Sequence, residues 1–557
     1  MQNKKKNIKE LIYILIGIIL INTLGNYFYT RFDLTQDQRY TLSNSAKETI
    51  VKVDLPIFIE VFLDGELPSE FKRLQSETKQ LLEEFEAYNS NVKFKFIDPS
   101  LKEGDIESLI KFGAKPAQVE IKQSGKTSTQ QVFPWAIASF KGKYVKIPLL
   151  KNQLGVSSEE RVNNSIQNLE YAFADGFNQL VHPKKRKVAV LKGNGELEDK
   201  YVADFFATLR DYYYIAPFTL DSVSKSPIKT LEQLNEFDLV VIANPTEKFS
   251  EEEKYILDQY TMSGGASLWL VDAVELATDS ISGNDFAFGK DLNLTDFFFK
   301  YGIRINPNLV KDLYSAPILL ASGNERDSQY NRYPWLYNPL SNNSSSHPIV
   351  TNIEAVKFEY ASSIDTLPNS LKKTILLSSS PISKIVGMPK EIDISKEINI
   401  NLKVVNEGPS PEEFNAGEIP LAVLLEGTFQ SAYSNRIKPF KTEKNKEVSK
   451  ETKMVVISDG SIIKNQFQGN RPLELGFDKW TNTFYGNKEF LLNTVNYLLD
   501  DNGLINIRSK DISVPFLDPI KVAEKRSFWQ WINLLLPLGL ITIFGLLFNY
   551  LRKKKYT

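Results

Sequence analysis

The sequence predicts a mixed α/β fold, in which two soluble α/β domains lie between one transmembrane helix at each end. Residues 11–30 and 529–551 carry no charged side chain and are each about one bilayer thickness long, so both are predicted to span a membrane. Between them, short continuous apolar runs alternate with stretches whose apolar residues recur every three or four positions. Buried strands that alternate with amphipathic helices are typical of α/β domains.

Clusters of basic residues flank both apolar segments. Lys4–Lys6 precede the first segment, and Arg552–Lys555 follow the second. Basic flanks tend to stay in the cytoplasm, so we expect cytoplasmic termini, anchoring in the lipid bilayer of the inner membrane, and the bulk of the chain in the periplasm. A cleaved signal peptide is the alternative for the first segment. The residues after its apolar core, Asn22–Tyr29, offer no small-residue cleavage site, which favours a retained anchor.

Composition excludes several kinds of chemistry. A chain of 557 residues is too long for one core, which predicts two to four domains. Its 67 basic and 68 acidic residues nearly balance and give no indication of a nucleic-acid partner. The sequence contains no cysteine, so disulfides, thiolate catalysis and cysteine-bound metals are excluded. Only His182 and His347 occur, both in linker-like surroundings, and we expect no metal and no cofactor.

Residues 31–150 are predicted to form the first extracytoplasmic domain. The pattern is typical of a strand, a helix, a strand, a helix and three further strands, at residues 57–63, 69–88, 92–97, 106–112, 117–122, 131–140 and 143–149. This order resembles a thioredoxin-like domain. Without a Cys-x-x-Cys pair such a domain cannot exchange disulfides, so a binding or scaffolding role remains.

One short motif in this domain resembles part of an ATP-binding loop. Gly125–Thr127 matches the end of a Walker A motif, but Glu120 stands where its first glycine is required. The surrounding pattern is strand, turn and strand, whereas a phosphate-binding loop joins a strand to a helix. We therefore expect a hairpin turn and no ATPase activity.

Residues 151–186 are predicted to be a connecting helix and linker, with Ser157 and Glu160 as a capping box. Residues 187–510 are predicted to be a doubly wound, mainly parallel α/β domain with loop insertions, because buried-type strands alternate with helices that include one capped by Ser250 and Glu253. Strands are expected at residues 187–191, 238–243, 267–271, 374–377, 421–425 and 454–457, irregular loops at 276–350, 410–417 and 438–451, a helix at 487–499, a tether at 511–528, and basic tails at 1–10 and 552–557.

The carboxyl ends of the predicted strands carry the candidate ligand site. In doubly wound sheets, ligands bind in a crevice outside these ends. The polar residues there form a candidate ligand crevice of Asn194, Glu196, Asn244, Asp272 and Asp459. Plain turn and helix-cap roles are the alternative for all of them, since the Gly-Asn-Gly sequence at 193–195 lacks the third glycine of a dinucleotide fingerprint.

Several sequence motifs resemble one bacterial family, the gliding-motility-associated protein G family, whose members are auxiliary components of ABC transporters. The motifs extend over essentially the whole chain and include residues 32–35, 39–43, 159–162, 169–172, 192–196, 239–243, 250–254, 258–260, 475–480, 485–492 and 507–510. The resemblance implies a subunit that works with a separate membrane permease, a cytoplasmic ATPase and cell-envelope proteins in gliding and associated secretion. It also implies a second domain laid out like class I glutamine amidotransferases, whose nucleophilic cysteine this chain lacks.

Two functional hypotheses follow. The first is a non-enzymatic auxiliary subunit that acts by binding or scaffolding, with no catalytic residue. The second is a cell-envelope hydrolase that acts on glycan or peptide through Glu196, Asp272 and Asp459.

Overall fold

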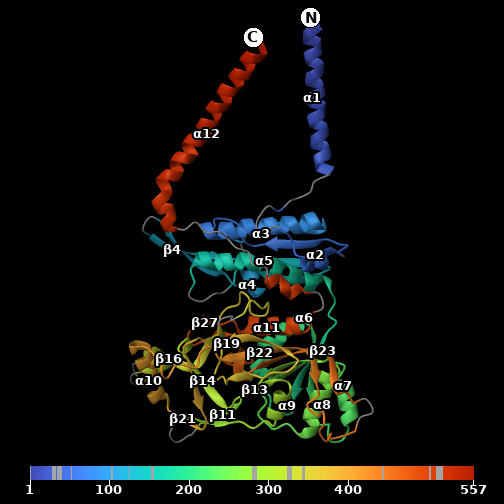
Figure 1. Ribbon diagram of the computed structural model, residues 1–557, viewed down its shortest axis with the longest axis vertical. Coiled ribbons are helices and arrows are strands. Elements are labelled where there is room, and N and C mark those ends of the chain that lie inside the picture. Colours follow the sequence, from blue (N-terminus) through green and yellow to red (C-terminus); the bar gives the residue numbers. More distant parts are fainter. Residues whose placement is uncertain are drawn as a thin grey trace. The chain divides into compact units, whose positions relative to one another are not determined.

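The computed structural model describes residues 2–27, 33, 41–51, 53–101, 105–123, 126–151, 156–278, 285–322, 329–341, 345–441, 445–500, 503–509 and 519–556. The chain divides into two compact units, residues 1–511 and 512–557. The mixed α/β class is confirmed (Figure 1). Residues 28–30 of the predicted first span and residues 511–518 of the predicted tether lie outside the described residues. So do residues 279–284, 323–328 and 342–344 of the predicted loop region.

A four-stranded sheet forms the centre of the N-terminal domain. Its order is β2 (Val92–Phe96), β1 (Ile57–Val61), β5 (Trp135–Phe140) and β6 (Lys143–Pro148). β1 and β2 are parallel, whereas β5 is antiparallel to both β1 and β6. The two-residue turn between β5 and β6 places Lys141 and Gly142 at positive φ, as tight hairpin turns require.

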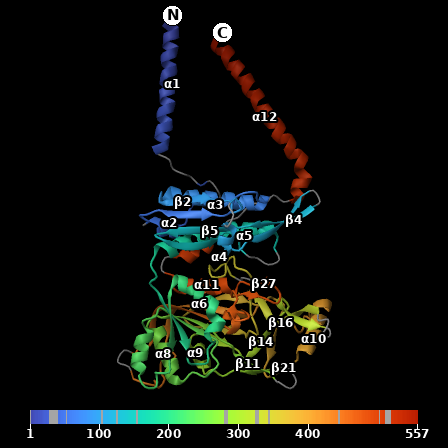
Figure 2. The same cartoon turned by 180° about the vertical axis from the view of Figure 1, so that it is seen from behind.

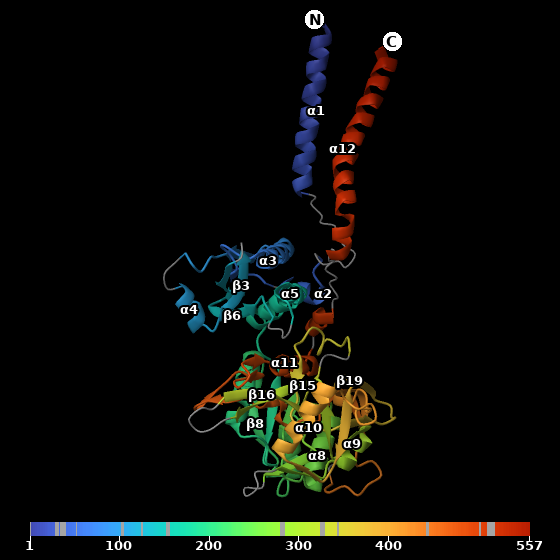
Figure 3. The ribbon, with the colours of Figure 1, turned by 90° about the vertical axis from the view of Figure 1, so that its left-hand side faces the viewer.

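Helices cover both faces of this sheet. On one face α3 (Ser69–Tyr88) packs against α5 (Ser158–Val181), with the rings of Phe85 and Phe177 edge to face at 5.1 Å. α2 (Asn44–Val51) joins the same apolar core, and α4 (Asp105–Lys111) covers the other face through Leu109. Figure 3 shows α2 and α4 on opposite sides of the N-terminal domain. The thioredoxin-like assignment stays a prediction.

The strand predicted at residues 131–140 is wrong as a single element. The chain forms a separate antiparallel hairpin from β3 (Ala117–Gln123) and β4 (Lys126–Val132), and enters the main sheet only at Trp135. Pro134 lies at the break, where its missing N–H removes a donor from the strand ladder. The hairpin context predicted around residues 125–127 is confirmed by the antiparallel pairing of Gln123 with Lys126.

A seven-stranded sheet forms the centre of the second domain. Its order is β19 (Lys372–Ser378), β22 (Pro420–Gln430), β23 (Val448–Ile457), β10 (Ala266–Leu270), β9 (Leu239–Ala243), β7 (Lys187–Lys192) and β8 (Tyr214–Thr219). The strands from β23 to β8 run parallel, while β22 is antiparallel to both of its neighbours. The late strands therefore resume the sheet that the early strands begin.

Two helical layers bury the faces of this sheet. α6 (Ala203–Tyr212) and α11 (Asn487–Leu498) share one apolar core with Val190 and Val241. α8 (Glu251–Met262) and α9 (Thr295–Lys300) share the opposite core with Leu191 and Ile242. Figures 1 and 2 show α6 and α11 on the side of the N-terminal domain and α8 and α9 on the far side. The amidotransferase-like assignment stays a prediction.

Capping of α8 follows the sequence prediction. The Ser250 side chain accepts from the Glu253 N–H, and the Glu253 carboxylate accepts from the Ser250 N–H. Ser157 caps α5 by accepting from the N–H of Glu160.

The prediction of irregular loops over residues 276–350 is wrong for most of the described part. This region contains β11 (Val274–Thr278), β12 (Asp285–Gly289), α9, β13 (Ile303–Ile305), β14 (Asn308–Asp312), β15 (Ser315–Ser322) and β16 (Gln329–Ser341). The prolines at 334 and 339, which indicate loops in a sequence, lie inside β16. They are tolerated because β16 pairs with β15 along one side over most of its length.

One predicted boundary also differs from the structure. β23 begins at Val448, inside the loop predicted at 438–451, because its first residues pair with the extended end of β22.

The remaining elements are η1 (Asp199–Val202), α7 (Pro227–Leu234), β17 (Val356–Lys357), β18 (Ile364–Thr366), β20 (Ser383–Gly387), β21 (Lys390–Ile392), α10 (Ile394–Glu407), η2 (Ser461–Ile463), β24 (Phe467–Gln468), β25 (Arg471–Pro472), β26 (Phe477–Asp478), β27 (Thr483–Phe484) and η3 (Leu504–Ser509).

Both terminal segments are helical. α12 (Pro519–Tyr556) contains the segment Glu524–Lys554, which is long and apolar enough to cross a membrane. A stretch of 18 residues within it has a mean hydropathy of 2.1. The described part of the predicted tether from residue 519 onward is thus the first part of α12. α1 (Gln2–Tyr27) contains a shorter apolar stretch, Leu11–Leu20. The first predicted span therefore stays a prediction.

A buried cluster of charges joins the two domains of the first unit. The carboxylate of Glu489, in α11, accepts from Lys151 Nζ and from Arg508 Nη2, both at 2.8 Å. The side chains of Lys151 and Arg508 are only 10% and 2% exposed. Arg508 also donates to the Thr351 carbonyl and lies over the ring of Tyr171 in α5, 5.0 Å from its centre.

We predict that Glu489→Ala destabilises the protein by about 3 kcal/mol, because it leaves two buried cations without their shared carboxylate. Urea or thermal unfolding of the full chain in detergent measures the change. Glu86→Ala is the matched control, since Glu86 pairs with Lys93 on an exposed surface and its removal should change stability little. Equal stability losses for the two variants would contradict the role of the cluster.

Candidate functional site

The sheet of the second domain has a topological switch point between β7 and β9. β7 leads through α6, on one face, to β8 at the sheet edge. β9 leads through α8, on the opposite face, to β10. Because the two connections leave in opposite directions, the loops at the carboxyl ends of β7 and β9 diverge there, which is where doubly wound sheets bind ligands.

Backbone hydrogen bonds hold the two loops together at this point. Leu197 N–H donates to the Ala243 carbonyl at 3.1 Å, and Thr246 N–H donates to the Asn194 carbonyl at 3.0 Å. Gly195 has a φ of +71°, and a Cβ there would meet the Thr246 hydroxyl. Three of the five predicted residues, Asn194, Glu196 and Asn244, thus belong to adjoining loops.

Asn194 and Glu196 form a partly closed polar cluster. The Glu196 carboxylate accepts from the Asn194 N–H at 2.8 Å, and the Asn194 amide donates to Glu253 at 3.2 Å. Burial raises the pKa of Glu196 above its ordinary value. Among the described residues, Asn194 Oδ1, Glu196 Oε1 and Asn244 Oδ1 are buried without a hydrogen-bond partner. All three of these unpartnered atoms are hydrogen-bond acceptors.

Asp272 and Asp459 meet around the turn that follows β23. The Gly460 N–H donates to Asp272 at 2.6 Å, and Asp272 also accepts from the Asn244 side chain. Asp459 is fully buried, and its oxygens accept from the Ser461 N–H and hydroxyl and from the Glu359 N–H, each at 2.7 Å. Burial, together with the neighbouring charge of Asp272, raises the pKa of Asp459.

The five predicted residues are therefore close to one another in two groups, and Asn244 links the groups. Their hydrogen bonds are chiefly to backbone groups of the turns that they stabilise. Among the described residues, no group of three or more His, Asp or Glu side chains has an arrangement that could hold a metal ion. Asp272 and Asp459, as a carboxyl pair with raised pKa values, have the chemistry of an acid-base pair.

A cavity of about 330 Å³, which we call the aromatic cavity, lies beyond these strand ends. Asp459 supports its wall, because Glu359 and Ser461 line the cavity and both donate to Asp459. This site was not predicted from the sequence; its lining includes Tyr201, Lys464, Phe467, Phe477, Lys479 and Trp480. The one sequence signal for it is the motif at residues 475–480, which contains Phe477, Lys479 and Trp480.

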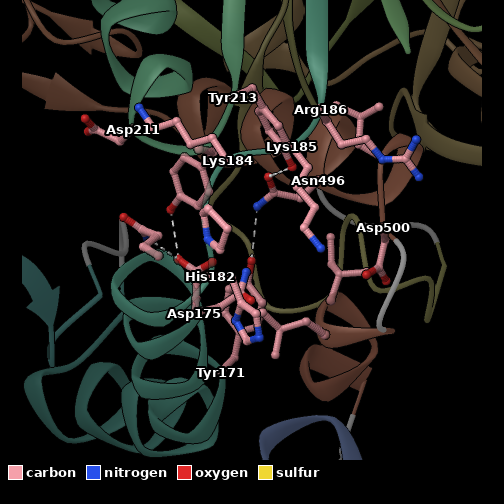
Figure 4. Close-up of a pocket in the computed structure, with 17 residues that line it drawn as sticks. Tyr171, Asp175, His182, Lys184, Lys185, Arg186, Asp211, Tyr213, Asn496 and Asp500 are labelled. Atoms are coloured by element: carbon pink, nitrogen blue, oxygen red, sulfur yellow. Dashed lines mark hydrogen bonds between the residues drawn. The ribbon is translucent and has the colours of Figure 1, made fainter. Parts of the chain in front are cut away.

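A second cavity, of about 190 Å³, lies between the two domains of the first unit. Figure 4 shows Tyr171 and Asp175 of α5 lining it together with Tyr213, Asn496 and the basic residues Lys184–Arg186. Tyr212 donates to Asp175 at 2.8 Å, and Gln179 donates to it at 2.9 Å. Burial raises the pKa of Asp175 to about 6. His182, which the sequence placed in a linker, also lines this cavity.

A family model described as an ABC-type uncharacterized transport system matches residues 185–494, which is more than half of the chain. The chain belongs to this family. Membership indicates a transport-associated accessory role in association with an ABC transporter complex, and together with the apolar helix Glu524–Lys554 it indicates association with a membrane. The matched region includes all five predicted residues and the aromatic cavity.

Other similarities extend beyond the second domain. A model described as a domain of unknown function (DUF7088) matches residues 36–139. An uncharacterized protein of Borreliella burgdorferi is 22% identical over 564 residues and is matched over the whole of both chains. The solved mmIFT52 N-terminal domain is 14% identical and is matched over its full length and 59% of this chain, with a TM-score of 0.33, which is too low to support an argument.

We predict that Asp175→Asn stabilises the protein at pH 8 by about 1 kcal/mol relative to the unsubstituted chain. Because the pKa of Asp175 is raised from 3.8 to about 6, the native state holds its proton more tightly than the unfolded state. The resulting stability is fully present below about pH 4 and is lost as the pH rises through about 6. Asparagine retains an acceptor for Tyr212 and removes the dependence on pH.

Urea unfolding of both proteins between pH 4 and 8 measures the difference. Asp211→Asn, at an exposed position of the same cavity, is the control and should leave the pH profile unchanged. A stability difference between Asp175→Asn and the unsubstituted chain that does not vary with pH would contradict the raised pKa.

Proposed function

We propose that this protein is a membrane-anchored, extracytoplasmic auxiliary subunit of an ABC transporter complex linked to gliding motility and associated secretion. It acts by binding or scaffolding and performs no catalysis. Its partners are a permease in the membrane, a cytoplasmic ATPase reached through the complex, and proteins of the cell envelope. The observation that carries the proposal is the family match over residues 185–494 in a chain that ends in an apolar helix.

The proposed topology has two spans and two cytoplasmic termini. The helix Glu524–Lys554 and its basic end support the second span. The first span is proposed from α1, whose apolar stretch Leu11–Leu20 follows a basic segment. In this arrangement the thioredoxin-like and amidotransferase-like domains both lie in the periplasm, away from ATP.

Hydrogen bonding at the strand ends supports a role without catalysis. A general acid or base needs a carboxyl oxygen that can reach the substrate. Asp459 is fully buried, and its oxygens accept from the Ser461 and Glu359 N–H groups. Asp272 accepts from Gly460 in the same turn. The hydrolase hypothesis keeps one favourable observation, the raised pKa values of this carboxyl pair.

We predict that the full chain, affinity-purified from membranes in mild detergent, brings with it a polytopic permease and an ATPase. Mass spectrometry of the purified complex identifies the chains. A matched purification of a chain truncated after residue 511, which lacks α12, should recover less permease, because it removes the proposed transmembrane contact. Recovery of no transporter subunit with the full chain would contradict the proposal.

A second experiment separates binding from chemistry. We predict that the paired substitution Glu196→Gln and Asp272→Asn leaves both assembly and gliding intact, since each amide retains an acceptor oxygen but loses acid-base function. The corresponding double alanine variant should also assemble and support gliding. A chain with either pair of substitutions that assembles normally but no longer supports gliding would favour the hydrolase.

A further inference from the structure

The aromatic cavity has the position and size of a ligand site. It lies beyond the carboxyl ends of the parallel strands, where Tyr201 follows the β7 loop and Ser461 follows β23. Its volume of about 330 Å³ is within the range of small-molecule pockets. None of the five strand-end residues predicted from the sequence lines it, so it is distinct from the crevice described above.

Aromatic rings form much of its wall. The rings of Tyr201 and Phe467 meet edge to face, with centres 5.5 Å apart. Phe477 packs against Phe484 at 4.6 Å, and Trp480 leaves 59% of its surface exposed. Large aromatic side chains on a cavity wall provide flat, apolar surfaces on which a planar ligand can stack.

Two lysines supply positive charge to the same wall. Lys464 Nζ lies 4.8 Å from the centre of the Tyr201 ring, and Lys479 Nζ lies 4.6 Å from that of Trp480. Lys479 also donates to the Phe467 carbonyl at 2.8 Å. Within the described part of the chain, no carboxylate lies within 4 Å of either ammonium group. Both charges are therefore left for a bound anion.

The acidic residues of the cavity are already paired. Lys357 Nζ lies 2.8 Å from Glu359 and 3.7 Å from Asp478, and its side chain is only 12% exposed. Asp478 also accepts from the Trp480 N–H at 2.9 Å. Lys357 offsets one of these two carboxylates. The three lysines and two acids of the lining therefore leave one net positive charge, and Lys464 and Lys479 carry the positive charge of the open wall.

Hydrogen bonds hold the wall in place without a ligand. The Asn465 N–H donates to the Tyr201 carbonyl at 2.7 Å, and the Asn465 side chain donates to the Lys200 carbonyl at 3.1 Å. These bonds tie the loop after β23 to η1. A site that is already ordered loses less conformational freedom when a ligand binds.

We propose that the aromatic cavity binds an organic anion whose carboxylate or phosphate group is attached to a flat, apolar body. The anionic group pairs with Lys464 and Lys479, whose ammonium groups lie over the rings of Tyr201 and Trp480. The flat body packs beside them against the aromatic wall, which includes Phe467, Phe477 and Trp480. This ligand site goes beyond the auxiliary role and does not depend on it.

The test uses the full chain in detergent micelles and three probes: phenyl phosphate, phenylacetate and the uncharged benzyl alcohol. Ligand-observed saturation-transfer NMR and calorimetry measure binding. At least one anion should bind at least about tenfold more tightly than benzyl alcohol, and comparison of the two anions distinguishes a phosphate from a carboxylate ligand. The proposal is overturned if neither anion binds at up to about 10 mM or if benzyl alcohol binds equally well.

Substitutions locate the binding. The double variant Lys464→Ala and Lys479→Ala should weaken anion binding by at least about tenfold, because it removes both cations. The pair Lys93→Ala and Lys95→Ala, at exposed positions of β2, is the matched control and should bind as the unsubstituted chain does. Trp480→Leu should weaken binding while unfolding midpoints stay unchanged. Unaltered binding by the double variant would place the anion elsewhere and overturn the proposal.

Discussion

The Glu489 carboxylate is the contact on which the arrangement of the first unit depends. It lies in α11 of the second domain and pairs with both Lys151, which follows the first domain's sheet, and Arg508, in η3. Leu504 and Ile507 of η3 join the apolar core of the N-terminal domain, so the chain returns to its first domain after completing the second. One carboxylate thus joins three segments that are distant in sequence, and breaking a buried ion pair leaves unpaired charges in a low-dielectric interior.

Local sequence signals predicted much of the fold, whereas non-local pairing decided the rest. The capping box at Ser250 and Glu253 and the apolar run of β9 depend on neighbouring residues, so both could be read directly. β16 contains two prolines, so its sequence indicates a loop. It is a strand because it pairs with β15, and the local sequence does not indicate that pairing. The break at Pro134 has the same cause, since the two halves of the predicted strand pair with different partners.

The candidate site shows a similar division. Strand-end polar residues were predictable because parallel strands bring their carboxyl ends to one edge, and Asn194, Asn244 and Asp272 do lie there. The roles of their side chains were not predictable from the sequence. The Asp459 carboxylate, for example, accepts hydrogen bonds from the N–H groups of Glu359 and Ser461. The aromatic cavity draws Tyr201, Lys464 and Trp480 from separate segments, and no spacing in the sequence brings these residues together.

The central claim is that the protein works through its attachment to a membrane transporter. Photo-crosslinking in native membranes, with a photoreactive residue placed at successive positions of Glu524–Lys554, tests this claim most directly. The account predicts adducts with a polytopic permease, concentrated on one face of the helix as packing of two transmembrane helices requires. Adducts with lipid alone at every position, or extraction of the protein without detergent, would contradict it.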